Sequence, residues 1–199
     1  LISGEDFVSE GQVLIDGYDI RSLSPNTLKK EISVITQKSD LFQGTLSSNL
    51  AYGYENISRR KINQSIEAGA ADSFISSLPG GLNYKLGSGG VGLSVGEKQR
   101  LALSRGYYRD SPVYIFDEST SALDPISEKR VNHYIQTKLR NKTVLIISHR
   151  LSSVQFADRV IVLNNGRVCE DGTHDELIRS GGYYAKLFYT QYRKEERAA

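Results

Sequence analysis

The sequence predicts an α/β fold whose main sheet is parallel and is covered by helices. Residues 113–116 and 143–147 are apolar at almost every position, and both runs have the length of strands. Strands that are apolar on both faces are typical of parallel sheets covered by helices. Between them, residues 126–139 place Val131 and Ile135 on one helical face. This strand–helix–strand order predicts a right-handed crossover connection.

The bulk composition fits one globular domain over residues 1–199. Of the 199 residues, 39% are hydrophobic and 24% are charged, which are ordinary values for a folded domain of this length. The net charge is +2, and the scattered lysines and arginines argue against a nucleic-acid-binding face. The single cysteine, Cys169, excludes a disulfide within the chain. No apolar run approaches the ~18 residues that a membrane-spanning helix needs.

The other segments predict short strands and longer helices around this core. Residues 10–17 are expected to form a short strand that closes in an Asp-Gly turn, with a small antiparallel β portion near 11–20. Residues 32–36 predict a further strand, and the glycine-rich residues 87–96 predict a loop. Helices are expected at 58–78, at 97–109 and from 181 to 199, and a hairpin is expected at 159–168.

Two adjacent acids, Asp117 and Glu118, directly follow the apolar run 113–116. Ligands of open α/β sheets bind beyond the carboxyl ends of the strands, so both side chains are expected at a binding edge. There one carboxylate can hold Mg²⁺ through its water shell, and the next can orient or deprotonate an attacking water. The alternative is a strand that simply ends in a solvated acidic pair.

The segment 93–100 reads Leu-Ser-Val-Gly-Glu-Lys-Gln-Arg, and it resembles the signature motif of ABC ATPases. Ser94, with Glu97 three residues later, also predicts a helix capping box. A helix N-terminus is a ready anion site, because its free N–H groups and the positive end of the helix dipole point the same way. The alternative is an ordinary capped helix that binds no ligand.

Two segments that follow the acids also resemble ABC motifs. Residues 119–124 resemble the D-loop, in which Asp124 is the residue expected at a dimer interface. Residues 148–152 follow an apolar run and resemble the H-loop of exporter-type domains, in which His149 is expected to contact the γ-phosphate. Without these neighbours, a lone histidine after a strand is more often a structural residue.

The segment that begins at Gln37 resembles the Q-loop, which precedes the acids in the family's motif order. Gln37 follows the predicted strand 32–36, and the resemblance implies that it reaches Mg²⁺ and the attacking water. Residues 41–50 resemble the stretch that touches the coupling helix of the membrane domain. The alternative for Gln37 is an ordinary polar loop residue.

Taken together, these motifs resemble the ATP-binding domain of an ABC transporter, of the multidrug and peptide exporter type, along essentially the whole chain. The resemblance implies a fold like that of P-loop NTPases, with an α-helical signature subdomain at about 45–95. It implies ATP and Mg²⁺ as cofactors and an ATPase that drives export. A second ABC ATPase domain and a transmembrane domain, fused or separate, are the expected partners. The expected location is the cytoplasmic face of a membrane, within an integral membrane transporter.

The resemblance also implies a role for each candidate residue. Glu118 is the expected general base, Asp117 the expected metal ligand, and Gln37 a ligand of both metal and water. His149 is expected at the γ-phosphate, and Ser94 and Gly96 are expected to act at the nucleotide of a partner domain. Asp124 is expected at the dimer interface, where it is a candidate cofactor-binding residue.

The chain departs from the family pattern at several places. No Gly-Lys pair occurs, so the phosphate-binding loop with the pattern G-x-x-x-x-G-K-[ST], the Walker A motif, is absent. We therefore expect an N-terminally truncated fragment that is inactive alone, with the front end of its sheet missing. Val95 and Glu97 stand where the signature usually has Gly and Gln, and Glu97 adds a negative charge beside the anion site. Ser88 and Gly89 stand where exporters usually carry Glu-Arg.

Two alternative functions remain open from the sequence. The first is a degenerate ATP-binding partner in a heterodimeric exporter, with little turnover of its own, which the altered signature favours. The second is a soluble ABC ATPase that does not transport. Proteins of that second kind usually carry coiled-coil insertions or tandem domains, and this sequence contains neither.

Overall fold

The computed structural model describes residues 1–6, 8–37 and 40–198, with side chains in the last helix described as far as Tyr192. It divides the chain into two compact units, Leu1–Ile147 and Ser148–Ala199, and each is described by itself. The single domain over residues 1–199 stays a prediction.

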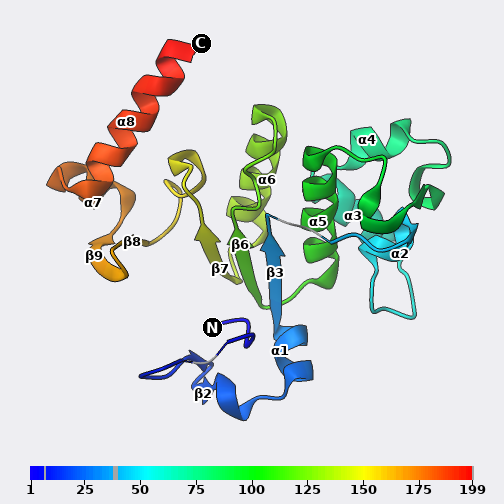
Figure 1. Cartoon of the computed structure of the whole chain (residues 1–199), viewed down its shortest axis with the longest axis horizontal. Coiled ribbons are helices and arrows are strands. Elements are labelled where there is room, and N and C mark those ends of the chain that lie inside the picture. The colour runs from blue at the N-terminus through cyan, green and yellow to red at the C-terminus, as the bar shows by residue number, and fades with distance from the viewer. Residues whose placement is uncertain (7, 38–39, 199) are drawn as a thin grey trace. The chain divides into compact units, whose positions relative to one another are not determined.

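The main sheet of the first unit contains three parallel strands. They lie side by side in the order β3 (Ile32–Thr36), β6 (Val113–Asp117) and β7 (Thr143–Ile147) (Figure 1). Helix α6 (Pro125–Lys138) connects β6 to β7, as the apolar pattern predicts, and Pro125 at its first position pre-sets the helical backbone. The α/β fold with a mainly parallel sheet is therefore confirmed.

Strand β6 is buried because both of its faces are covered. Tyr114 and Phe116 point to one face, where they form an aromatic cluster with Tyr107 of α5 (Val95–Arg109) and, through it, Tyr134 of α6. Ile115 points to the opposite face, as the two-residue period of a strand requires. There it packs in a second cluster that includes Leu28 of α1 (Pro25–Glu31).

The N-terminal part contributes a small antiparallel hairpin. Strands β1 (Leu14–Ile15) and β2 (Tyr18–Asp19) pair across the turn Asp16–Gly17. Both turn residues have positive φ, 50° and 83°, as the tight hairpin turn that favours Asp-Gly requires. The antiparallel portion near 11–20 is thus confirmed, although β1 is much shorter than the expected strand at 10–17.

A helical part follows β3, and it has its own core. Strand β4 (Gly44–Thr45) pairs with β5 (Lys85–Leu86). The mostly helical stretch expected at 58–78 is confirmed, and it is divided into two helices because the chain turns at Gly69 and at Ala70, whose φ is +53°. The helices before α5 are α2 (Leu46–Leu50), α3 (Arg59–Ala68) and α4 (Asp72–Ser77).

Helix α5 belongs to both parts of the first unit. Its Leu101 and Tyr108 lie in the core of the helical part, whereas Tyr107 packs against the sheet. Gly69 of the helical part approaches α5 so closely that a Cβ at this position would lie 2.2 Å from the Ser104 hydroxyl. A helical subdomain with the approximate bounds 45–95 stays a prediction.

The second unit packs a hairpin against two helices. Strands β8 (Val160–Asn164) and β9 (Arg167–Gly172) pair antiparallel, which confirms the hairpin expected at 159–168. The Glu170 carboxylate accepts the N–H groups of Tyr183 and Tyr184, so it caps the start of α8. The two helices are α7 (His174–Ser180) and α8 (Tyr183–Ala198). The short 3-10 helices of the two units are η1 (Ile20–Ser22), η2 (Gly81–Asn83), η3 (Ser88–Gly90) and η4 (Leu151–Ser153).

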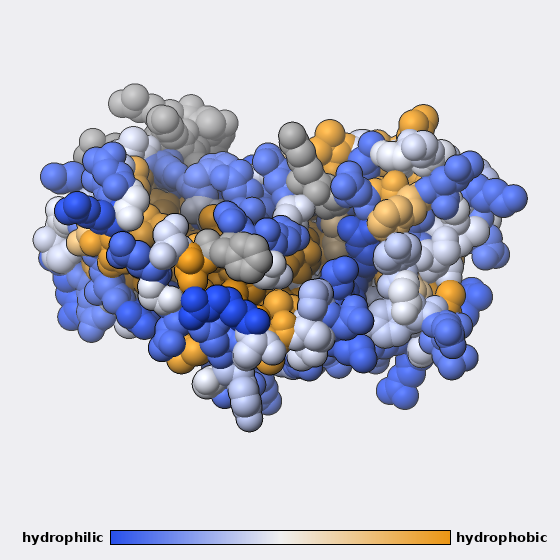
Figure 2. All heavy atoms as spheres, turned by 60° about the horizontal axis from the view of Figure 1, so that its bottom comes forward, coloured by the Kyte–Doolittle hydropathy of each residue, from blue (hydrophilic) through white to orange (hydrophobic). Residues whose placement is uncertain are grey.

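Apolar side chains remain at the surface in several places, and Figure 2 shows some of them among polar residues on the face that it draws. In the second unit, Ile161, Leu163 and Val168 of the β8–β9 hairpin are exposed. In the first unit, Ile147 at the end of β7 is also exposed. None of the described helices is both long enough and apolar enough to cross a membrane.

Candidate functional site

The carboxyl ends of the three parallel strands bring the predicted residues of the first unit to one edge. In the register of the sheet, Thr36 lies beside Asp117, and Asp117 lies beside Ile147. Gln37 and Glu118 each follow one of these residues, so they leave neighbouring strands at the same level. The Glu118 N–H donates to the Ile147 carbonyl over 2.9 Å, which continues the ladder one residue past β6. The structure thus brings Gln37, Asp117 and Glu118 to the same edge of the sheet.

Glu118 begins a tight turn with a strained backbone. Its φ is +48°, a left-handed conformation that costs a non-glycine residue about 1–3 kcal/mol. The Glu118 carbonyl accepts from the Ser121 N–H over 3.2 Å, and the Leu123 N–H donates to the Thr120 carbonyl over 3.1 Å. These bonds hold the turn that leads from β6 to the start of α6.

The predicted capping box at the start of α5 is present. The Glu97 N–H donates to the Ser94 Oγ over 3.3 Å, and Glu97 Oε2 accepts from both the N–H and the hydroxyl of Ser94, each over 2.8 Å. The next two N–H groups, of Val95 and Gly96, have no acceptor in the described residues, and the first turn of a helix offers them none. Two backbone donors at a positive helix end therefore remain open to an anion.

Gly96 also has a packing role that the motif alone does not reveal. A Cβ at Gly96 would lie 2.9 Å from the Ala122 carbonyl oxygen, in the turn that follows β6. The start of α5 and this turn are therefore in direct contact. Val95, by contrast, is 68% exposed, so its side chain does not disturb the packing of α5.

Asp124 is held by partners within the chain. Its Oδ1 accepts from the N–H groups of Ile126 and Ser127, over 3.1 and 2.9 Å, so it caps the N-terminus of α6. Its Oδ2 accepts from the Ser127 hydroxyl over 2.6 Å and pairs with Arg100 Nη1 over 3.2 Å. The hydrogen bond from the Ser127 hydroxyl is the main reason that the pKa of Asp124 lies below its ordinary value.

His149 lies in the second unit, two residues after β7 along the chain. Its backbone carbonyl accepts from the Gln191 side chain of α8, and the neighbouring Arg150 N–H donates to the Ser148 hydroxyl over 2.9 Å. The role predicted for His149 at a γ-phosphate stays a prediction.

Sequence reasoning missed Gln99, which is only 1% exposed although it is polar. Its side-chain amide contacts the turn after β6, as described below. One signal could have found it: Gln99 lies four residues before Leu103 and seven before Gly106, so it continues the buried face of α5. A polar residue on an apolar helical face needs a hydrogen-bond partner inside the fold.

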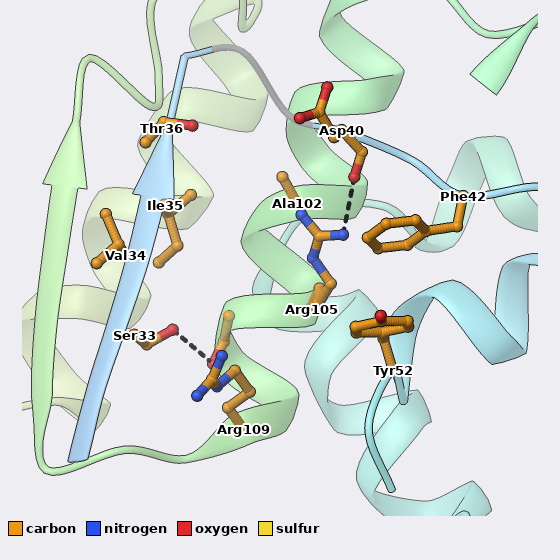
Figure 3. A pocket seen from close by; sticks show the side chains of 11 residues that line it. Ser33, Val34, Ile35, Thr36, Asp40, Phe42, Tyr52, Ala102, Arg105 and Arg109 are labelled. Carbon is orange, nitrogen blue, oxygen red and sulfur yellow. Dashed lines mark hydrogen bonds between the residues drawn. The ribbon is translucent and has the colours of Figure 1, made fainter. Parts of the chain in front are cut away.

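A cavity of about 270 Å³ lies beside the end of β3, between that strand, α5 and the start of the helical part (Figure 3). Phe42 and Tyr52 stack on one wall with ring centroids 4.4 Å apart. The Arg105 guanidinium donates to the Asp40 carbonyl over 2.9 Å. Burial, together with the nearby positive charge of Arg109, lowers the pKa of Arg105. The cavity thus combines aromatic surface with positive charge next to the segment that begins at Gln37.

The residues at the sheet edge fit Mg²⁺ and a phosphate group. Asp117 and Gln37 offer carboxylate and amide oxygens, the donor type that Mg²⁺ prefers. Mg²⁺ in phosphate-handling sites takes one or two protein ligands and completes its shell with phosphate and water. In the described part of the chain, no group of three or more His, Cys, Asp or Glu residues could hold a metal ion. The open N–H groups of Val95 and Gly96 suit phosphate oxygens.

Known proteins match this chain closely. The family model described as ABC transporter matches residues 1–121. Proteins described as ATP-dependent lipid A-core flippases match well: the one from Legionella pneumophila (strain Paris) is 41% identical over 92% of this chain and 31% of its own length. The one from Desulfotalea psychrophila is 39% identical over 92% of this chain and 32% of its own length.

A solved structure, of a bacterial Atm1-family ABC exporter with ATP bound, superposes with a TM-score of 0.86. That protein is 36% identical, and the match covers 92% of this chain and 32% of that one. The chain spans about a third of the length of the curated relatives it matches. The family model, the relatives and the fold agree with the residues assembled at the sheet edge: the chain belongs to the ABC transporter family.

Proposed function

We propose that this chain is the ATP-binding and ATP-hydrolysing domain of an ABC exporter, and that the intact transporter uses hydrolysis at an interface of two such domains to drive export. The observation that carries the proposal is the register of the main sheet, in which Thr36, Asp117 and Ile147 are neighbours. This register gathers the amide of Gln37 and the carboxylates of Asp117 and Glu118 at the edge where α/β sheets bind their ligands.

In this proposal each residue has a distinct task. Asp117 and Gln37 hold Mg²⁺, which neutralises phosphate charge when bound. Glu118 orients the attacking water and accepts its proton, while His149 donates a hydrogen bond to the γ-phosphate. Ser94 and Gly96 act at the nucleotide of the second ABC ATPase domain, the partner across the interface, and Asp124 lies at that interface.

The second proposed partner is the membrane domain of the exporter, which would hold this chain at the cytoplasmic face of the membrane. The cavity beside β3 supports this docking, because Phe42 and Tyr52 are exposed apolar surface within and just after the segment 41–50. Exposed aromatic side chains are typical anchors of protein interfaces. The relatives are about three times as long as this chain, which leaves enough length in their polypeptides for a membrane domain beside the part that this chain matches.

A second candidate function is that of an ATP-binding partner with little turnover in a heterodimeric exporter. One observation favours it: the Glu97 carboxylate already accepts both the N–H and the hydroxyl of Ser94. An anionic ligand would have to compete with this carboxylate. Turnover of the full transporter should rise on the double replacement of Val95 by Gly and Glu97 by Gln if this candidate is right, and stay unchanged otherwise.

The proposal is tested by the metal dependence of ATP hydrolysis in the full-length transporter. The unmutated protein should hydrolyse ATP only with Mg²⁺, and Asp117→Asn should raise the Mg²⁺ concentration needed for half-maximal turnover as well as lower the rate. Asp158→Asn is the matched control, because Asp158 is an exposed aspartate far from β6 along the chain. Hydrolysis that is independent of Mg²⁺, or unchanged by Asp117→Asn, contradicts the proposal.

A further inference from the structure

The side chain of Gln99 joins helix α5 to both ends of the turn that follows β6. Its Nε2 donates to the Glu118 carbonyl over 3.3 Å and to the Ser121 hydroxyl over 3.4 Å. Its Oε1 accepts from the Ala122 N–H over 2.9 Å. The Gln99 side chain is almost completely buried, whereas the turn residues that it contacts are partly exposed or exposed.

The turn needs such an anchor because its first residue is strained. Glu118 has a φ of +48°, and left-handed conformations of non-glycine residues persist only where the surroundings hold them. The Glu118 N–H is fixed by the Ile147 carbonyl, and its carbonyl is fixed by Gln99 together with the Ser121 N–H. Both polar groups of the Glu118 backbone therefore have partners, which sets the direction in which its side chain leaves the chain.

We propose that Gln99 is a positioning residue for ATP hydrolysis, which holds the backbone of Glu118 so that the carboxylate meets the attacking water. The proposal rests on the proposed function, in which Glu118 is the general base. Gln99 itself does not touch the reacting atoms; it acts through the turn that carries Glu118.

Glutamine meets two requirements at this position. The Glu118 carbonyl requires a donor, and the Ala122 N–H requires an acceptor, so the side chain must offer both at one end. Glutamate at position 99 keeps the acceptor but sets a negative oxygen against the Glu118 carbonyl. Methionine fills a similar volume and offers neither group, so the Ala122 N–H loses this acceptor and the Glu118 carbonyl loses this donor.

The contacts of Gln99 and Gly96 also connect the start of α5 to the turn that carries Glu118. Gln99 lies on α5 just after the capping box that begins at Ser94, and Gly96 packs directly against the Ala122 carbonyl. A shift of the first turn of α5, where the partner's nucleotide is proposed to bind, therefore moves the turn that holds Glu118. Gln99 gives this chain a direct link between the signature segment and its own general base.

The test compares Gln99→Met, Gln99→Glu and the control Gln136→Met in the full-length transporter. Gln136 is an exposed glutamine on α6 with no contact to the turn. Both Gln99 variants should lower kcat for ATP hydrolysis by about 10- to 100-fold, because a misplacement of a catalytic group by about 1 Å costs up to about 10²-fold. The KM for ATP should change less than about twofold, since no nucleotide contact is removed.

Two further measurements separate positioning from a general structural effect. In the Glu118→Gln background, Gln99→Met should lower the residual rate no further, because both changes act through the same carboxylate. Hydrogen exchange of the peptide 117–123 should be faster in the Gln99 variants and unchanged in Gln136→Met. Additive losses in the double variant, or equal changes in kcat and KM, overturn the proposal, as does loss of the folded state in both Gln99 variants.

Failure of the inference on Gln99 can be told apart from failure of the proposed function. If Glu118→Gln abolishes hydrolysis while both Gln99 variants keep kcat within about twofold, the inference on Gln99 fails and the proposed function stands. If Glu118→Gln hydrolyses ATP at the unmutated rate, Glu118 is not the base, and the inference on Gln99 fails with it.

Discussion

Replacing Asp124 by alanine should destabilise the first unit, because one carboxylate both caps α6 and pairs with α5. Loss of an N-cap aspartate costs about 0.5–2 kcal/mol, and the cap here serves two N–H groups. The ion pair with Arg100 adds at most about 1 kcal/mol, since the Asp124 side chain is 49% exposed. We therefore expect a loss of about 2 kcal/mol in the free energy of unfolding, which lowers Tm by roughly 4–8 °C in a domain of this size.

Thermal unfolding of the full-length protein at neutral pH measures this loss, with Asp158→Ala as the control that should leave Tm unchanged. The pKa of Asp124 is lowered in the folded state, so its contribution is present above its ordinary pKa of about 4 and is lost as pH falls through the folded pKa. The difference in Tm between Asp124→Ala and the unmutated protein should therefore shrink in strong acid. An N-cap of this strength must lower Tm by more than about 1 °C when it is lost. If the Tm of Asp124→Ala at neutral pH stays within about 1 °C of the unmutated value, this account of Asp124 is refuted.

Three more predictions test the fold and the site. Gly69→Ala should destabilise the first unit by about 1–3 kcal/mol, because the added Cβ would lie 2.2 Å from the Ser104 hydroxyl. Gly87→Ala is the control, since its Cβ would meet only Val91, at 3.5 Å. Equal melting temperatures of the two variants would be evidence against the close packing of Gly69. Tyr107→Phe should leave Tm unchanged or raise it, since the buried Tyr107 hydroxyl has no hydrogen-bond partner among the residues that the structure describes, and a clear drop in Tm would mean that the hydroxyl is bonded. The 199-residue chain alone should release phosphate from ATP only at background rate, because it lacks the Gly-Lys phosphate loop; sustained release that Glu118→Gln removes would contradict this.

The central sheet could be predicted from the sequence because its strands carry their own signal. Residues 113–116 and 143–147 are apolar at almost every position of both faces, which is typical of strands in a covered parallel sheet, although of these two strands only β6 is buried in the structure and β7 is half-buried or exposed. The turn Asp16–Gly17 was predictable for a similar reason, since the turn conformation with two positive φ values selects Asp-Gly. In these segments the residue types that favour a strand or a turn locally are also the ones that the folded structure needs there.

Other features depend on contacts that the sequence does not display. The apolar spacing of 58–78 predicted the helical character of this stretch but not the break at Gly69 and Ala70, where Gly69 packs closely on α5. Strands β4 and β5 have two residues each and lie about 40 residues apart, too short for any periodicity to reveal. Gln99 was missed because a glutamine reads as a surface residue until its partners are known.

The sequence predicted which residues are candidates for the site, but it did not predict the contacts that these residues make. Motif order alone identified Gln37, Asp117 and Glu118, and the strand register explains why they meet. The sequence did not reveal that Asp124 already makes four contacts with three residues of the chain, Ile126, Ser127 and Arg100. Such partners arise from the meeting of α5 and α6, which is a property of the packed unit.

The most direct test of the account is ATP binding and hydrolysis by the Glu118→Gln variant of the full-length transporter. Hydrolysis should fall by about 10²–10⁴-fold, because the group that orients and deprotonates the water loses its charge. ATP binding should survive, since the proposed metal ligand Asp117 and the phosphate donors are unchanged, and Glu55→Gln at an exposed position should alter neither. Loss of ATP binding, or hydrolysis at the unmutated rate, would contradict the assignment of the two acids.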